Sequence, residues 1–374
     1  MKSLQEVVGA YDPAAPLDRA FTIPASWYVD QRVCDLETRT VFSRTWQMVG
    51  RADQVAEKGS YITTTLAGEP IVVVRGGDGV LRGFFNVCRH HAAAVMTEPA
   101  GKINSLRCPY HGWTYSLEGE LKGTPDFAGV CDFDRRANGL MPVAASIWEN
   151  WVFVRLSADG PTLEEYLGAD LVGQFKPLEV GGLRWMERRH YDFECNWKVF
   201  VDNYLDGGYH IPYLHTGLDS VLDYGKYAIE NGPRHCLQHS PIVKDNAEPE
   251  TGAVRGGERA LYYWIYPNFM VNWYEGVMDT NLVLPLGVDR TEVIFDFYFP
   301  DVVSDDARAR NIASINVGQR IQDEDTAICK SVQRGLTSRA YNAGRLSVRR
   351  EAGEHLFHRL LHGSLSEGLA PAHG

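Results

Sequence analysis

The sequence lacks three features that would each define a class of protein. It contains no uninterrupted run of 18 apolar residues, so a membrane-spanning helix is not expected. It has no internal repeat and no low-complexity segment, so a repeat architecture is not expected either. It also lacks an excess of positive charge: 37 Lys and Arg face 48 Asp and Glu, and the net charge is −11. This balance argues against a nucleic-acid partner.

Targeting signals and paired cysteines are missing as well. Residues 1–30 contain Glu6, Asp12 and Asp18 and no continuous apolar core, so neither a signal peptide nor a typical transit peptide is expected there. The seven cysteines are an odd number, and most show no paired spacing, so we expect a cytoplasmic protein. Three lie in apolar or helical patterns and are expected to be inert core residues: Cys34, Cys195 and Cys329.

Four residues in the first third of the chain have the spacing of metal ligands. Cys88 and His90 form a C-x-H pair, and after seventeen intervening residues Cys108 and His111 form a C-x-x-H pair. Two thiolates for one iron and two imidazoles for the other are the ligands of a Rieske [2Fe–2S] cluster, which carries one electron at a time. Zinc is the alternative, but C-x-H is a poor zinc half-site, and the run Cys-Pro-Tyr-His-Gly-Trp continues the Rieske pattern.

The 374 residues, 44% of them hydrophobic, suit about two domains. Residues 1–46 form an arm followed by an amphipathic helix from Trp27 to about Trp46. Residues 47–157 carry the alternation and hairpin turns of an all-β module, with the cluster ligands at loop tips. Residues 158–374 mix strands with helices, so we predict an α+β domain. Its expected strands are 191–198, 258–274, 279–286 and 292–300, and its expected helices are 305–334 and 347–362.

A second metal site is predicted in the α+β domain. His210 and His215 are five residues apart, so they diverge by about 140° on a straight helix and converge only where the helix ends or bends. Pro212 gives a reason for a bend. Asp206 lies four residues before His210, within reach of its imidazole N–H. The double glycine at 207–208 removes side chains where another segment packs closely.

A carboxylate would complete a 2-His-1-carboxylate triad for iron, which leaves positions open for O₂ chemistry. The helical segment near 305–334 offers three adjacent acids. We select Asp325, with Asp323 as the alternative. The aromatic residues Trp264, Tyr266, Trp273 and Tyr274 lie on expected strands, where they face either the sheet core or a substrate pocket.

These motifs resemble the catalytic subunits of Rieske non-haem iron oxygenases, and within that family the choline monooxygenases in particular. The resemblance covers nearly the whole chain, and the double glycine is its most specific element. One departure is His91-Ala92, where the family commonly has Arg-Gly. The matching stretches outside the cluster motif are Cys195–Phe200, Asp202–His210, Tyr266–Met270, Met278–Leu286, Glu324–Asp325, Val332–Leu336 and Phe357–Leu361.

The resemblance implies a Rieske domain before a helix-grip catalytic domain that binds mononuclear Fe(II). It implies that Asp206 relays electrons to the iron, although members commonly carry that acid one residue later, where this chain has Gly207. Asn203 would lie near the iron. The family assembles as homotrimers in which the cluster of one subunit lies beside the iron of the next.

The implied activity is O₂-dependent hydroxylation, with electrons passing from NAD(P)H through a separate ferredoxin or flavin reductase. Choline is the first candidate substrate; it would give betaine aldehyde hydrate, on the route to glycine betaine. N-demethylation of a betaine or carnitine-like compound and hydroxylation of an aromatic ring are the alternatives. The alternative from a different class of protein is a Rieske electron carrier without enzymatic activity. The predicted second iron site argues against it.

Overall fold

A computed structural model describes residues 2–243, 245 and 247–370. The chain divides into two compact units, one formed by Phe42–Tyr166 and the other by Met1–Val41 together with Leu167–Gly374. Among the described residues, no helix has the length and apolarity needed to cross a bilayer.

The unit Phe42–Tyr166 is built on an antiparallel sheet in the order β1-β10-β9-β4-β3-β2-β5, with a small sheet β6-β7-β8 beside it. The run Ile71–Val74 on β3 is buried on both faces, because alternate residues pack into two different apolar clusters. The strands are β1 Gln47–Arg51, β2 Ser60–Leu66, β3 Glu69–Arg75, β4 Leu81–Phe85, β5 Ala100–Lys102, β6 Leu106–Arg107, β7 Thr114–Tyr115, β8 Leu121–Gly123, β9 Pro142–Trp148 and β10 Trp151–Arg155.

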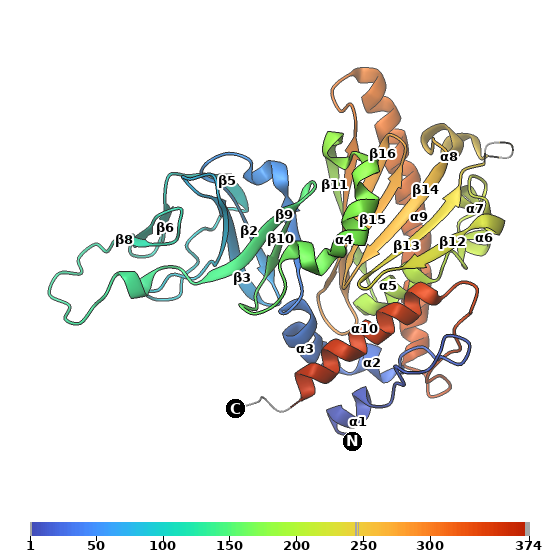
Figure 1. The fold of residues 1–374 in the computed structure, drawn as a ribbon, viewed down its shortest axis with the longest axis horizontal. Helices are drawn as coiled ribbons and strands as arrows, with labels where there is room; N and C mark the ends of the chain where they lie inside the picture. Colours follow the sequence, from blue (N-terminus) through green and yellow to red (C-terminus); the bar gives the residue numbers. More distant parts are fainter. Residues whose placement is uncertain (1, 244, 246, 371–374) are drawn as a thin grey trace. The chain divides into compact units, whose positions relative to one another are not determined.

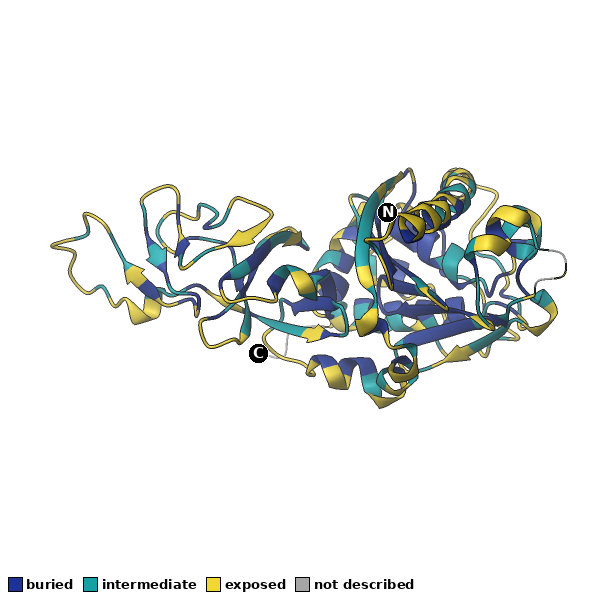
Figure 2. Cartoon of the chain, turned by 90° about the horizontal axis from the view of Figure 1, so that it is seen from above, coloured by how far each residue is buried: buried dark blue, intermediate teal, exposed yellow. Residues whose placement is uncertain are grey.

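The larger unit is an antiparallel sheet in the order β11-β17-β16-β15-β14-β13-β12, and the long helix α9 runs along one face of it (Figure 1). Its central strands are buried, while exposed residues concentrate on loops and the outer sides of helices (Figure 2). Its strands are β11 Arg184–Phe193, β12 Ala228–Asn231, β13 His235–Pro241, β14 Arg259–Ile265, β15 Phe269–Tyr274, β16 Val277–Pro285 and β17 Thr291–Phe299.

Helices pack against this sheet and carry several of the predicted iron-site residues (Figure 1). The α-helices are α1 Leu4–Val8, α2 Ser26–Val29, α3 Gln31–Glu37, α4 Leu163–Phe175, α5 Trp197–Leu205, α6 Ile211–Leu214, α7 Thr216–Asp219, α8 Pro249–Val254, α9 Asp305–Leu336 and α10 Ala352–Leu369. The α+β class and the order of an all-β module before a mixed catalytic domain are confirmed.

Several predicted elements are wrong in their limits. The strand predicted over 258–274 is two strands, β14 and β15, joined by a turn at 266–268, and the helix predicted over 347–362 lies at Ala352–Leu369. Two further limits are set by capping side chains. The helix predicted from Trp27 to Trp46 is interrupted, because Asp30 ends α2 and caps α3 by accepting a hydrogen bond from the Arg32 N–H. The strand predicted through residue 198 stops at Phe193. There Asn196 accepts a hydrogen bond from the Lys198 N–H and starts α5 instead. In both places a capping side chain outweighed the apolar pattern.

The apolar residues that recur along α9 do not all face the sheet. Ile315 is buried, but Ile312, Ile328 and Val332 are exposed in the single chain. The side of α9 that faces the sheet is instead partly polar and includes Asp325. A helix that lines a polar site cannot be recognised by an apolar stripe alone.

Candidate metal centres and substrate pocket

The two cluster loops have the same backbone design. The Ala92 N–H donates to the Cys88 carbonyl at 3.0 Å, and the Gly112 N–H donates to the Cys108 carbonyl at 3.1 Å. The residue that closes each loop has a left-handed backbone, with φ of 61° at Ala92 and 72° at Gly112. Such a backbone favours glycine, so Ala92 keeps the loop geometry with a strained residue. Alanine in place of the glycine of Arg-Gly therefore adds backbone strain to this loop.

The side chains on these loops fit a [2Fe–2S] cluster. Both thiols are buried, and the ring centroids of His90 and His111 are 4.7 Å apart. The Nδ1 of His90 is buried and has no hydrogen-bond partner among the described residues, so it is available to iron. Burial and the neighbouring Cys88 raise the pKa of Cys108, so two adjacent thiolates need a metal cation to remain charged.

The iron site is positioned where α5 ends. Gly207 and Gly208 follow the helix with φ of 68° and 69°, and they turn the chain so that His210 precedes α6 and His215 follows it. The two imidazole centroids come within 4.8 Å of each other. The sequence predicts a helix break between the two histidines, with Pro212 as its reason. In the structure α5 ends at Leu205, before both histidines, and the glycines make that turn. A short helix, α6, then holds Pro212 in its first turn and ends at Leu214, just before His215.

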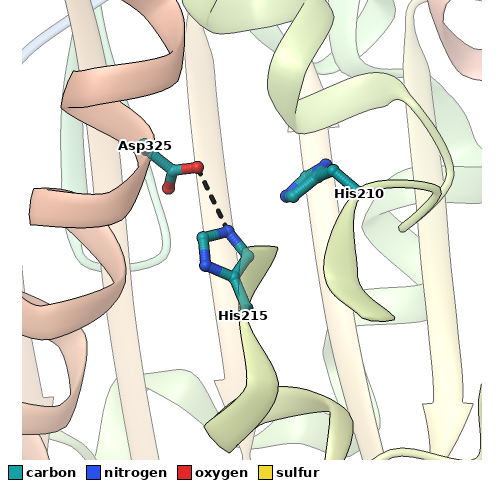
Figure 3. A group of neighbouring side chains, drawn as sticks. All are labelled: His210, His215 and Asp325. Atoms are coloured by element: carbon teal, nitrogen blue, oxygen red, sulfur yellow. Dashed lines mark hydrogen bonds and ion pairs between the residues drawn. The ribbon is translucent and has the colours of Figure 1, made fainter. Parts of the chain in front are cut away.

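Asp325 on α9 completes the group, and its carboxylate points at the two imidazoles (Figure 3). One ligand atom from each of His210, His215 and Asp325 lies within 4.8 Å of the others. The side chain of Asp325 is buried, and its Oδ1 is 3.1 Å from the Nε2 of His215. Asp323 is exposed and accepts a hydrogen bond from Gln319 instead. The donor set of two imidazoles and one carboxylate fits non-haem iron.

Carboxylates hold the other nitrogen of each imidazole. Asp206 lies 2.6 Å from the Nδ1 of His210, and Glu324 lies 2.6 Å from the Nδ1 of His215. This contact fixes each ring so that its Nε2, not its Nδ1, would be the metal ligand. Burial lowers the pKa of His215, but Asp325 and Glu324 outweigh it and raise that pKa, so the two carboxylates favour a positive charge at this position.

Asn203 also lies at this site, where its Nδ2 donates to Asp325 at 2.9 Å. It therefore orients the carboxylate that would hold iron. Sequence reasoning found Asn203 and Asp206 but missed Glu324. Three adjacent acids on a helix do not reveal which one faces a histidine 109 residues away.

A pocket adjoins the triad, and tyrosines form much of its wall. The Tyr262 and Tyr274 hydroxyls are 2.6 Å apart, and the Tyr204 hydroxyl donates to Asn272 at 2.8 Å. Asn272 in turn donates to the buried carboxylate of Asp279 at 2.7 Å, and burial raises the pKa of Asp279. Beyond the triad, the polar and aromatic residues that line the pocket include Tyr204, Tyr227, Gln238, Arg255, Tyr262, Asn272, Tyr274, Asp279, Asn281 and Phe295.

Of the four aromatic residues offered by the sequence, Tyr274 lines this pocket and the other three do not. Trp264 lies on the same strand as Tyr262 and shares its parity, but its ring contacts Phe357 of α10. Strand alternation gives the face of a sheet, while the covering helix decides whether that part of the face is core or cavity. Tyr204 and Tyr227 lie outside the predicted strands, on α5 and just before β12.

The fold and the two sites define the class of Rieske non-haem iron oxygenases. Residues 45–134 match the family model of the Rieske [2Fe–2S] domain, and residues 181–367 match that of the ring hydroxylating alpha subunit (catalytic domain). The chain belongs to this family of oxygenase alpha subunits, which use a Rieske cluster and mononuclear iron.

Named relatives support the same assignment. The chain is 39% identical to the chloroplastic choline monooxygenase of Arabidopsis thaliana, over 98% of this chain and 88% of that protein. It is 30% identical to the carnitine monooxygenase oxygenase subunit of Escherichia coli K12, over 86% of each. The solved structure of the quaternary ammonium Rieske monooxygenase CntA with L-carnitine superposes with a TM-score of 0.80 at 28% identity, covering 97% of this chain and 99% of that one.

Proposed function

We propose that this oxygenase hydroxylates a quaternary ammonium compound, with choline as the first candidate substrate. The observation that carries the proposal is the tyrosine-lined pocket with a buried carboxylate, Asp279, that adjoins His210, His215 and Asp325. Aromatic faces attract quaternary ammonium groups, and a buried carboxylate adds a counter-charge. The relatives named for choline and carnitine support the same substrate class.

The reaction takes R–H, O₂, two electrons and two protons to R–OH and water. The iron would supply O₂ activation, held by His210, His215 and Asp325. Hydroxylation at the alcohol carbon of choline gives betaine aldehyde hydrate, the precursor of glycine betaine. Hydroxylation at an N-methyl group instead gives a carbinolamine that loses formaldehyde, which is the second candidate outcome. The aromatic-ring alternative is disfavoured by the charged groups of the pocket.

The electron route is part of the proposal. NAD(P)H would supply electrons through a separate ferredoxin or flavin reductase to the cluster at Cys88, His90, Cys108 and His111. In a homotrimer, Asp206 would connect the cluster of one subunit with His210 of the next. The 2.6 Å contact between Asp206 and His210 supports this, as does the CntA structure described in terms of inter-subunit electron transfer.

The working limits of the domains and the location of the protein are proposed as follows. Residues 47–157 bind the cluster, residues 158–374 bind the iron and substrate, and residues 1–46 pack with the latter. We propose a cytoplasmic location, which would differ from the chloroplastic one named for the plant relatives.

Turnover with a reductase tests the proposal. The purified protein should consume O₂ with choline or another quaternary amine and form the hydroxylated or demethylated product. It should contain about three irons per chain. Asp325→Ala should keep the visible spectrum of the cluster and lose product formation. Turnover of aromatic acids without any quaternary amine would overturn the substrate class, and two irons per chain would favour a simple electron carrier.

A further inference from the structure

A buried arginine, Arg255, lines the candidate substrate pocket. Its contacts bear on which group the substrate has besides its ammonium group. Arg255 follows α8, lines the pocket and is only 4% exposed. Its Nη1 donates to the Ser314 hydroxyl at 2.5 Å, and its Nη2 approaches the Ser314 carbonyl at 3.4 Å. Both contacts tie the guanidinium to α9 and fix its orientation.

One donor of this guanidinium, the Nε–H, is buried and has no hydrogen-bond partner in the described part of the chain. No carboxylate of the described chain lies within the 4.0 Å of an ion pair with it. The Tyr274 ring lies beside the guanidinium, with its centroid 4.9 Å from Cζ, and Asp279 in the same pocket is close enough to interact with Arg255 electrostatically. A buried cation with an open donor is costly unless an anion completes it.

Nε–H and the adjacent Nη2–H form the edge that binds a carboxylate with two hydrogen bonds. We propose that Arg255 binds a carboxylate of the substrate, so that the preferred quaternary ammonium compound is a zwitterion. Its ammonium group would lie among the tyrosines with Asp279, and its carboxylate would pair with Arg255. Charges would then alternate along the pocket. Choline offers no anion, so it would leave the guanidinium unpaired beside a second cation.

This inference rests on the proposed quaternary ammonium site, and within that site it ranks a zwitterion above choline, the first candidate by resemblance. The test is calorimetric titration of the anaerobic holoenzyme with glycine betaine, γ-butyrobetaine, the methyl ester of each, and choline. The esters keep the ammonium group and remove the anionic charge. At least one zwitterion should bind about tenfold or more tighter than its ester and than choline, as expected for a charge-assisted bidentate contact.

Variants assign the difference to Arg255. Arg255→Gln should remove the preference for the zwitterion, and Arg255→Lys should restore part of it, since lysine keeps the charge without the paired donors. Arg290→Gln is the matched control, because Arg290 pairs with Asp192 at the exposed surface. If Arg255→Gln fails to fold, the comparison of acid and ester on the unaltered protein still decides.

The outcomes separate the two proposals. Choline or an ester that binds as tightly as its zwitterion would overturn the role of Arg255 and leave the quaternary ammonium site standing. Equal losses for zwitterion and ester in Arg255→Gln would overturn it as well. If none of these compounds binds, the proposed function fails together with this inference.

Discussion

Tyr115 is a single residue positioned to tune the cluster. Its oxygen accepts the Arg89 N–H at 3.0 Å and lies 3.4 Å from the Cys88 sulfur. Burial and the Cys88 thiol raise its pKa, so the hydroxyl keeps a proton that it can donate to the sulfur. A hydrogen bond to a ligand thiolate stabilises the more negative, reduced cluster.

Tyr115→Phe should therefore lower the midpoint potential of the cluster. One hydrogen bond of about 1 kcal/mol corresponds to about 40 mV for one electron. A redox titration followed by absorbance or electron paramagnetic resonance measures it. Tyr61→Phe is the control, since Tyr61 is buried in the same apolar cluster and makes no hydrogen bond to Cys88 or Cys108 in the described structure. An unchanged or higher potential in Tyr115→Phe would contradict the donor role.

Glu354 on α10 shows how a single buried acid affects stability. Its carboxyl is 6% exposed, and its nearest charged partner is His358, at 3.7 Å, which already bonds to Asp202 at 3.0 Å. Burial, then the neighbouring carboxylates, raises the pKa of Glu354 well above its usual range. Because the folded-state pKa exceeds the unfolded one, folding is penalised increasingly as pH rises from the unfolded pKa toward the folded one.

Glu354→Gln should consequently stabilise the protein at alkaline pH. We expect a free energy of unfolding higher by about 1–3 kcal/mol at pH 8, since no buried charge remains to be desolvated, and a smaller gain at pH 5. Urea unfolding at the two pH values measures it. Glu164→Gln, at an exposed position of α4, should show no such pH-dependent gain. A variant less stable than the parent at pH 8 would show that the ionised carboxylate is needed.

At the scale of elements, the turn between α5 and α6 determines the iron site. A Cβ on Gly207 would lie 2.0 Å from the Arg350 carbonyl oxygen, and the residue has φ of 68°. One on Gly208 would lie 3.0 Å from the Tyr227 ring, beside the pocket. The double glycine thus lets the segment carrying His210 pack against neighbouring backbone and pocket wall. This agrees with the close packing expected from the sequence.

Gly207→Ala should displace this turn. Backbone overlap and a left-handed backbone together should cost about 2 kcal/mol or more, and iron content should fall because His210 moves away from Asp325. Thermal unfolding and metal analysis measure the two effects. Gly335→Ala in α9 is the control, since nothing lies within 4 Å of its Cβ position and alanine favours a helix. Full iron content in Gly207→Ala would contradict this role.

The positions of the helices and strands also explain which parts of the site can be predicted from the sequence. The cluster ligands and the two histidines are recognisable because their spacing is local and chemically demanding. The wall of the pocket is not, because Tyr227 just before β12, Tyr262 on β14 and Asp279 on β16 come from segments that meet only in the folded sheet. Arg255 follows a six-residue helix, and its unpaired donor becomes visible only when Ser314 of α9 is seen beside it. The strand pattern thus predicts the sheet, whereas tertiary packing determines which side chains line the pocket.

At the scale of the whole molecule, electrons must pass from the cluster to the mononuclear iron. In the proposed trimer, these two centres belong to neighbouring subunits. A chain with Cys108→Ser would lack the cluster but keep the iron site. A chain with Asp325→Ala would lack the iron site but keep the cluster. Each homotrimer should be inactive, because every subunit then lacks the same half of the route.

Mixed trimers distinguish transfer between subunits from transfer within one. If the two variants are co-expressed in equal amounts and assemble at random, half of the subunits keep an iron site. Half of those receive a neighbour with an intact cluster, so product formation should recover to about a quarter of the normal rate per subunit. Mixing the separately purified homotrimers, with no subunit exchange, is the control and should give no recovery. Transfer confined to one chain would leave the co-expressed trimers as inactive as the homotrimers, since no single chain carries both centres.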